Sequence, residues 1–141
     1  LSSENSFLEK LAAAGSLGNI GNKNVIPELV SLINRWPSDW LDSDGPELRW
    51  EAALALLKMN YSDQKTQNII NNLLTRSYYE SYQELDENTV NFVILKILNI
   101  LYSIDDSDLL LPYYDKLSIL SNSDPNLEIR NFAKKSLKVI Q

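Results

Sequence analysis

The stretch RWEAALALLKM, from Arg49 to Met59, decides the fold, because three similar stretches lie at nearly even distances from it. It overlays KLAAAGSLGNI from Lys10 at an offset of 39 residues, and NFVILKILNIL from Asn91 at an offset of 42. The third stretch in turn overlays RNFAKKSLKVI from Arg130, again 39 residues further on. Self-similarity at such a period is typical of stacked helical repeats.

Apolar and small residues recur in three columns of these copies, four and then three positions apart, which places them on one helical face. The columns are Ala13, Ala52, Ile94 and Ala133, then Leu17, Leu56, Leu98 and Leu137, then Ile20, Met59, Leu101 and Ile140. A small residue in the first column lets neighbouring helices approach closely. We expect Ala52, Leu56, Leu98, Ala133 and Leu137 to be buried between helix layers.

A second helical pattern lies between successive copies, so that each repeat holds two helices. We expect first helices near 25–36, 63–78 and 108–121, and second helices near 5–20, 46–60, 88–103 and 126–140. Pro27 and Pro112 fall in the first turn, where a missing N–H costs nothing. The candidate capping residues are Asn24, Ser62 or Asp63, Asn88, Ser107 or Asp108, and Ser123 or Asp124.

These patterns predict an all-α fold with no β-structure. A lone helix pair cannot bury its apolar face, whereas stacked pairs form a continuous core. We therefore expect a right-handed α-solenoid, a superhelix of about three and a half antiparallel helix pairs. It would be one repeat domain over residues 1–141, and because Leu1 falls inside a half-repeat we expect a piece of a longer chain.

The run LAAAGSLGNIGNKNVIPELVSLI, from Leu11 to Ile33, resembles the HEAT-repeat family, in particular its short bacterial form, the phycobilisome-lyase HEAT-like repeat. That family also has an Asp before the second helix of a repeat and an Arg in its first turn. Asp124 with Arg130, and Asp44 with Arg49, match this pattern. The resemblance implies that these four residues form a structural ladder at the turns. The third copy has Asn91 in the Arg column, which implies a weaker link there.

Composition excludes most catalytic chemistry. The chain has no Cys and no His, so it has no thiol nucleophile, no imidazole base and no Cys/His zinc site. No catalytic, cofactor-binding or metal-binding residue stands out, and the acidic run from Asp42 to Glu47 reads as a helix-capping turn. A net charge of −6 disfavours nucleic acid and anionic membranes as partners. We expect a cytoplasmic protein that is not an enzyme.

Stacking would line up the turns within each repeat, at residues 36–47, 78–88 and 121–128, along one edge. These turns hold ten of the nineteen acidic residues, no Lys or Arg, and five of the thirteen aromatic residues. Asp39, Glu80 and Glu84 are candidates for binding a basic partner segment, with Trp40 and Tyr82 as aromatic anchors. The alternative is that the acids solvate loops and cap helices while the aromatics fill gaps between repeats.

The inner, concave face of the second helices is the other candidate surface. Trp50 and Phe92 are bulky in a column where Asn131 shows that an apolar residue is not required. If exposed, they would form an apolar groove for a helix or an extended peptide. The alternative is that both pack between repeats.

These observations favour a non-catalytic scaffold that binds a protein or peptide through the acidic edge, the concave face, or both. The resemblance to lyase-type repeats admits an alternative, a subunit or chaperone of a bilin lyase-type enzyme. A further alternative is the recognition arm of a larger signalling or ATPase protein.

Overall fold

The computed structural model describes residues 23–35, 45–81 and 85–140, and it has helices and no strands over these ranges. The prediction of an all-α protein is confirmed for them. The α-helices are α2 (Ile26–Arg35), α3 (Gly45–Lys58), α4 (Gln64–Leu73), α5 (Glu87–Tyr102), α6 (Ser107–Leu110), α7 (Tyr114–Ser123) and α8 (Leu127–Ile140). Three 3₁₀ turns accompany them, η1 (Lys23–Val25), η2 (Arg76–Ser81) and η3 (Leu111–Tyr113).

The second helices of the repeats, α3, α5 and α8, begin and end within two residues of the predicted positions. The predicted helix 5–20 lies outside the described residues. Two predictions of a continuous first helix are wrong. Helix α4 ends at Leu73 and is followed by η2, and the segment predicted at 108–121 is divided into α6, η3 and α7.

Pro112 causes the division of the segment predicted at 108–121. It was expected in the first turn of one helix, but it lies in η3, after a helical segment that begins at Ser107. Without an N–H, Pro112 cannot continue the hydrogen-bond pattern of α6. The chain therefore passes through a 3₁₀ turn before α7 starts.

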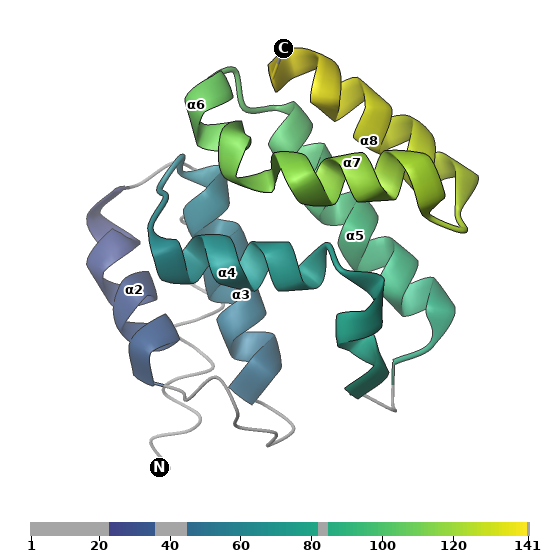
Figure 1. Cartoon of the computed structure of the whole chain (residues 1–141). Coiled ribbons are helices and arrows are strands. Elements are labelled where there is room, and N and C mark those ends of the chain that lie inside the picture. The colour runs from purple at the N-terminus through teal and green to yellow at the C-terminus, as the bar shows by residue number, and fades with distance from the viewer. Residues whose placement is uncertain (1–22, 36–44, 82–84, 141) are drawn as a thin grey trace. The chain divides into compact units, whose positions relative to one another are not determined.

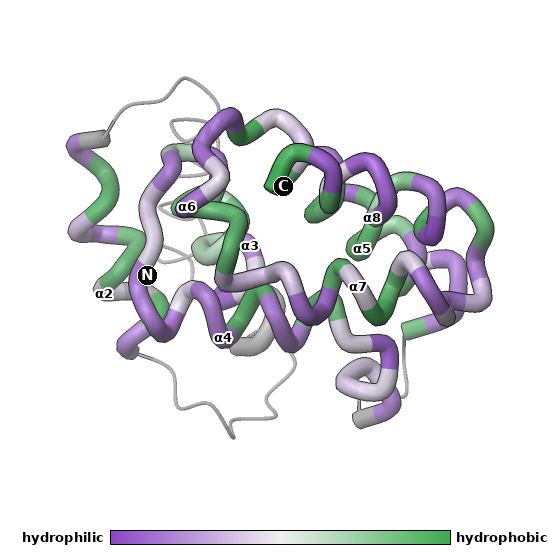
Figure 2. The backbone as a smooth tube through the Cα atoms, turned by 45° about the horizontal axis from the view of Figure 1, so that its top comes forward, coloured by the Kyte–Doolittle hydropathy of each residue, from purple (hydrophilic) through white to green (hydrophobic). Residues whose placement is uncertain are grey.

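The chain divides into two compact units, Leu1–Ile69 and Ile70–Gln141, with the boundary inside α4. In the first unit, α2 and α3 pack against each other and run in opposite directions (Figure 1). In the second unit, α7 runs antiparallel to α8, and α5 packs against α8 as well (Figure 1). Apolar and polar stretches alternate along α5 and α8 in Figure 2, as expected for helices that bury one face.

The described residues of the three predicted core columns are buried, except for Leu137 and Ile140, which are half-buried. Ala52, Leu56, Leu98 and Ala133 have no exposed surface. Leu137 is only half-buried, so its placement in the core is wrong. From Arg49 to Lys58, α3 is buried except at Glu51 and Lys58, which lie seven residues apart on one helical face.

In the part of the chain that the structure describes, four side chains cap helices, and all four are Asp or Asn. Asp63 accepts the N–H of Thr66 at the start of α4, as predicted. The other three caps differ from the predicted residues by one or two positions: Asp86 accepts from Thr89, Asp106 from Asp108, and Asn126 from Ile129. Burial alone would raise the pKa of Asp63, but hydrogen bonds from Thr66 and Tyr61 lower it below its usual value.

Asn60 ends α3 in the left-handed region, with φ of 59°. The N–H of Tyr61 reaches the carbonyl of Leu56 at 3.0 Å, and the N–H of Asn60 reaches that of Leu57 at 3.0 Å. These two bonds form the Schellman motif that commonly closes a helix. Among residues with a side chain, Asn tolerates this conformation best.

The buried columns predict a graded response to truncation. Leu56→Ala and Leu98→Ala should each lower the free energy of unfolding by about 2–5 kcal/mol, because each leaves a cavity in a fully buried position. Leu137→Ala should cost less than about 2 kcal/mol, since part of that side chain already faces water. Urea denaturation followed by circular dichroism measures all three. Equal losses at the three positions would contradict this assignment of the core.

The helix end predicts a contrast between two substitutions at one exposed position. Asn60→Val should lower the free energy of unfolding by about 1–2 kcal/mol, because a β-branched residue disfavours positive φ. The matched control Asn60→Gly should change it by no more than about 0.5 kcal/mol. Thermal melts of the two variants test this expectation. If the helix end were flexible, both variants would melt like the parent protein.

Candidate interaction site

Asp124, just after α7, is the centre of a polar cluster in the second unit. Its Oδ1 accepts from Nε of Arg76 at 2.9 Å, and its Oδ2 accepts from Nη2 of the same residue at 2.9 Å. This is a bidentate pair, the stronger geometry for Arg and a carboxylate. The side chain of Asp124 is 2 % exposed and that of Arg76 is 25 % exposed. The pair therefore fixes the start of η2 to the end of α7.

Two more residues complete the cluster. Nη2 of Arg76 also donates to Oδ1 of Asn91 on α5, at 2.6 Å. Nη1 of Arg130 on α8 donates to the main-chain oxygen of Asp124, at 2.9 Å. Asp124 thus joins the end of α7 to η2 and α8, and Asn91 links α5 to the same cluster through Arg76.

This arrangement differs from the expected ladder in one respect. Arg130 bonds the main-chain carbonyl of Asp124 at the turn, while the carboxylate of Asp124 pairs with Arg76. Asn91 was expected to make a weaker link or none, but it holds Arg76 by a charge-assisted bond. Arg49 is buried at 7 % exposure, while Asp44 lies outside the described residues.

Sequence reasoning missed Arg76, although a signal for it exists. It is the only Lys or Arg between Lys65 and Lys96. A lone cation among buried helices is a candidate for a specific partner, because an unpaired buried charge is costly. The hydrogen bonds that Arg76 donates to Asp124 raise the pKa of Arg76, so its charge is present at every ordinary pH.

Fewer residues of the acidic edge are exposed than its composition suggests. Asp124, counted among its acids, is buried and paired. Tyr79, counted among its aromatics, is buried, and its hydroxyl donates to the carbonyl of Leu73 at 2.6 Å. Burial also raises the pKa of Tyr79. It fills a gap, which was the alternative to exposure.

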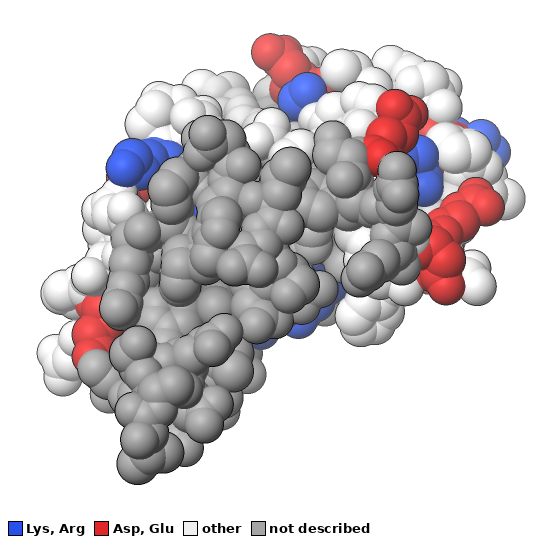
Figure 3. Space-filling model, turned by 90° about the horizontal axis from the view of Figure 1, so that it is seen from below, with Lys and Arg blue, Asp and Glu red and all other residues white. Residues whose placement is uncertain are grey.

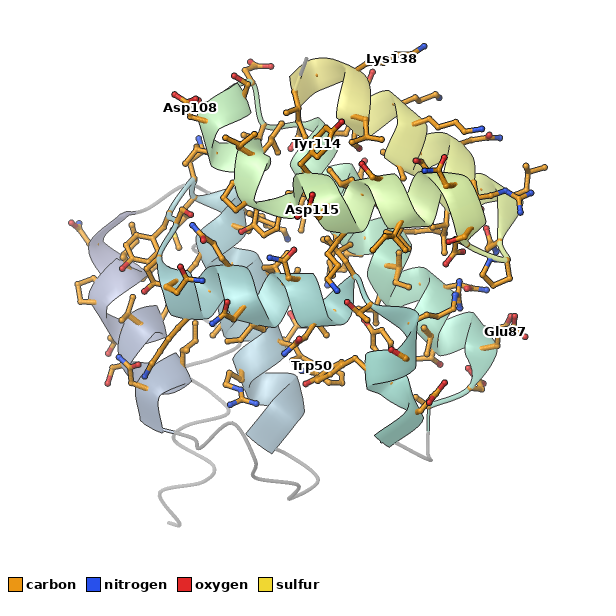
Figure 4. The ribbon with its side chains drawn as sticks, viewed as in Figure 1. Trp50, Glu87, Asp108, Tyr114, Asp115 and Lys138 are labelled. Atoms are coloured by element: carbon orange, nitrogen blue, oxygen red, sulfur yellow. The ribbon has the colours of Figure 1, made fainter. Side chains whose placement is uncertain are left out.

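Exposed acids remain at the turn before α5. Of the described residues there, Glu80, Asp86 and Glu87 are exposed. Figure 3 shows acidic side chains on its right-hand side, where α5 begins, and Figure 4 shows Glu87 in the first turn of that helix. Asp39, Trp40, Tyr82 and Glu84 lie outside the described residues.

The two groove candidates differ in exposure. Trp50 on α3 is 7 % exposed, so its assignment to an open groove is wrong and it packs in the interior. Phe92 on α5 is 66 % exposed. One column of the repeat thus holds a core residue in one copy and a surface residue in another.

Phe92 begins a stripe along α5, which we call the α5 stripe: Phe92, Leu95, Asn99 and Tyr102. The spacings of three, four and three place these residues on one helical face. Phe92 and Tyr102 are exposed, Tyr102 at 48 %, while Leu95 is half-buried. The Tyr102 ring meets that of Phe132 on α8 edge to face, with centroids 5.8 Å apart. The stripe therefore continues onto α8.

Helix α8 carries positive charge on its exposed face. Lys134, Lys135 and Lys138 are exposed, and α8 carries no acid after Glu128. Figure 4 shows Lys138 near the end of the helix. Lysines in a last turn complement the helix dipole, which explains Lys138 in part. Three together make a basic patch on a chain with a net charge of −6.

Two other kinds of site are absent from the described ranges. No cluster of Asp, Glu, His or Cys there could hold a metal ion. No helix there combines the length and the hydropathy needed to cross a membrane.

Comparison with known proteins identifies no relative. The chain matches no protein-family model, no curated protein and no solved structure.

The Asp124 cluster predicts a large loss of stability when the partly exposed cation Arg76 is removed. Arg76→Met should lower the free energy of unfolding by about 3 kcal/mol, because it leaves the buried carboxylate without its ion pair. This is the lower end of the usual range, since Arg76 itself is partly hydrated. Lys138→Met, which removes an exposed cation, should stay within about 0.5 kcal/mol. Chemical denaturation of the two variants makes the comparison, and equal small losses would contradict the role given to Asp124.

Proposed function

We propose that the chain is a HEAT-like repeat module that binds a protein or peptide partner and carries out no catalysis itself. The proposal includes the right-handed solenoid of about three and a half repeats in a single domain. It is supported by the repeated helix pairs and by the resemblance of Leu11 to Ile33 to the short bacterial repeat. Helical repeats present extended surfaces on which partners lie.

The exposed aromatic residues of α5 carry this proposal. Phe92 and Tyr102 are large side chains that the fold leaves open to water, and they lie on one helical face. Aromatic residues are enriched among those that dominate binding energy. An amphipathic helix could lay its own apolar face along the α5 stripe, with anchors spaced three and four residues apart.

The charges beside the stripe indicate the chemistry of the partner. Lys134, Lys135 and Lys138 favour a helix with an acidic flank, and they would steer its approach. The alternative is a basic segment on the acidic edge. That edge retains Glu80, Asp86 and Glu87 among the described residues, but Asp124 is already paired. The α5 stripe is therefore the better supported surface.

Photo-crosslinking in the source cell tests the surface. With benzoylphenylalanine in place of Phe92, a defined partner band should form, because the substituted ring lies in the contact. The matched control places it at Leu111, which is 60 % exposed but lies in η3. The same band from both positions, or none from position 92, would overturn the assignment to α5.

Binding to the crosslinked partner should then be measured by calorimetry. Phe92→Ala should weaken it by about tenfold or more, as loss of an interface anchor does. Glu80→Lys with Glu87→Lys should strengthen or preserve binding of an acidic partner. Loss of binding in that double variant, with Phe92→Ala unaffected, would move the site to the acidic edge.

A further inference from the structure

A hollow of about 230 Å³ lies in the second unit, between the α4–η2 junction and α7. It is lined by Leu74, Thr75, Arg76, Ser77, Lys116, Ile119, Leu120, Ser123, Asp124 and Pro125. At about 30 Å³ per water, the volume corresponds to about eight waters. This is smaller than a typical pocket for a drug-sized ligand, and it suits one amino-acid residue.

One side of the hollow is apolar. Leu74 and Leu120 form its floor, at 1 % and 3 % exposure. Ile119 is 57 % exposed at its rim, beside Pro125. An apolar side chain placed here would be removed from water on several sides, and would cover Ile119 at the same time.

The other side is cationic. Arg76 and Lys116 are positive and Asp124 is negative, so the lining carries one net positive charge. Lys116 is half-buried, and it forms no hydrogen bond or ion pair with any residue in the described ranges. Its ammonium is therefore available to a ligand, while Arg76 is held in place by Asp124 and Asn91.

The apolar and cationic residues of the lining together favour one kind of anion over others. A phosphate would favour the planar fork of an Arg, but Nε and Nη2 of Arg76 are already used by Asp124. An Asp or Glu side chain has no apolar group to fill the floor. The C-terminal residue of a peptide carries a single carboxylate and an apolar side chain on the same carbon atom, which matches both walls.

We propose that this hollow binds the C-terminal residue of a peptide or protein that ends in an aliphatic side chain. The carboxylate pairs with the ammonium of Lys116 and accepts from the exposed hydroxyl of Ser77. The side chain lies against Leu74, Ile119 and Leu120. Since the α5 stripe contributes nothing to this lining, the inference does not depend on the proposed function.

An acetylated pentapeptide ending in Leu, titrated into the ¹⁵N-labelled full chain, tests the site. We expect saturable shifts of backbone signals from residues 74–77 and 116–125. The same peptide with a C-terminal amide should bind at least about tenfold more weakly, because the charge is lost. Added salt should weaken binding of the acid form. Equal affinity of the acid and the amide would overturn the proposal.

Two variants and one small acid complete the design. Lys116→Gln should weaken binding about tenfold or more, whereas Lys65→Gln, at an exposed position of α4 outside the lining, should leave it unchanged. Ile119→Trp should block the apolar side, and melting curves would show that each variant remains folded. Unchanged binding in Lys116→Gln or Ile119→Trp would overturn the site. If 4-methylpentanoate binds as tightly as the peptide, the hollow takes free organic acids, and the peptide assignment is wrong.

Discussion

From Arg49 onward, α3 is buried on all but one narrow face, and this burial is the constraint on which the fold depends. Arg49, Trp50 and the run from Ala52 to Leu57 are buried, whereas Glu51 and Lys58 are exposed. A helix with apolar residues around its whole circumference is stable only when it is covered on every side. Helix α2 provides part of that cover. The small residues Ala52, Ala53 and Ala55 let such neighbours approach closely.

In the second unit, a polar cluster joins elements that are far apart in the sequence. Asp124 joins them, because its buried carboxylate accepts hydrogen bonds from Arg76 and its main-chain carbonyl accepts one from Arg130. Arg76 reaches Asp124 across 48 residues, and Arg130 reaches the carbonyl of the same residue. Such a pair adds less net stability than its bond lengths suggest, because both charges lose water. Its bidentate geometry fixes how the start of η2 and the end of α7 contact each other.

The same cluster connects the fold to both proposed surfaces. Asn91, which holds Arg76, precedes Phe92 at the start of the α5 stripe. Arg76 and Asp124 also form part of the wall of the hollow beside α7. Arg76 and Asp124 are thus held in place before a ligand enters the hollow, which lowers the entropic cost of ordering that part of its wall.

The sequence by itself determined where most helices lie and which of their faces turn inward. Helical spacing and capping are interactions within about four residues, so they can be read locally. This is why Ala52, Leu56 and Leu98 were placed in the core, and why Asp63 was recognised as a cap. Local chemistry also accounts for the misses nearby, such as the division of a helix at Pro112.

The tertiary structure alone decided which members of a repeated column face water. Trp50 and Phe92 occupy equivalent positions, yet one is buried and the other is exposed. The pairing of Arg76 with Asp124 could not be predicted from the sequence either, because 48 residues separate the two. A repeat fixes the direction of a side chain relative to its own helix, but its burial depends on the neighbour that packs there. That neighbour differs from one copy to the next.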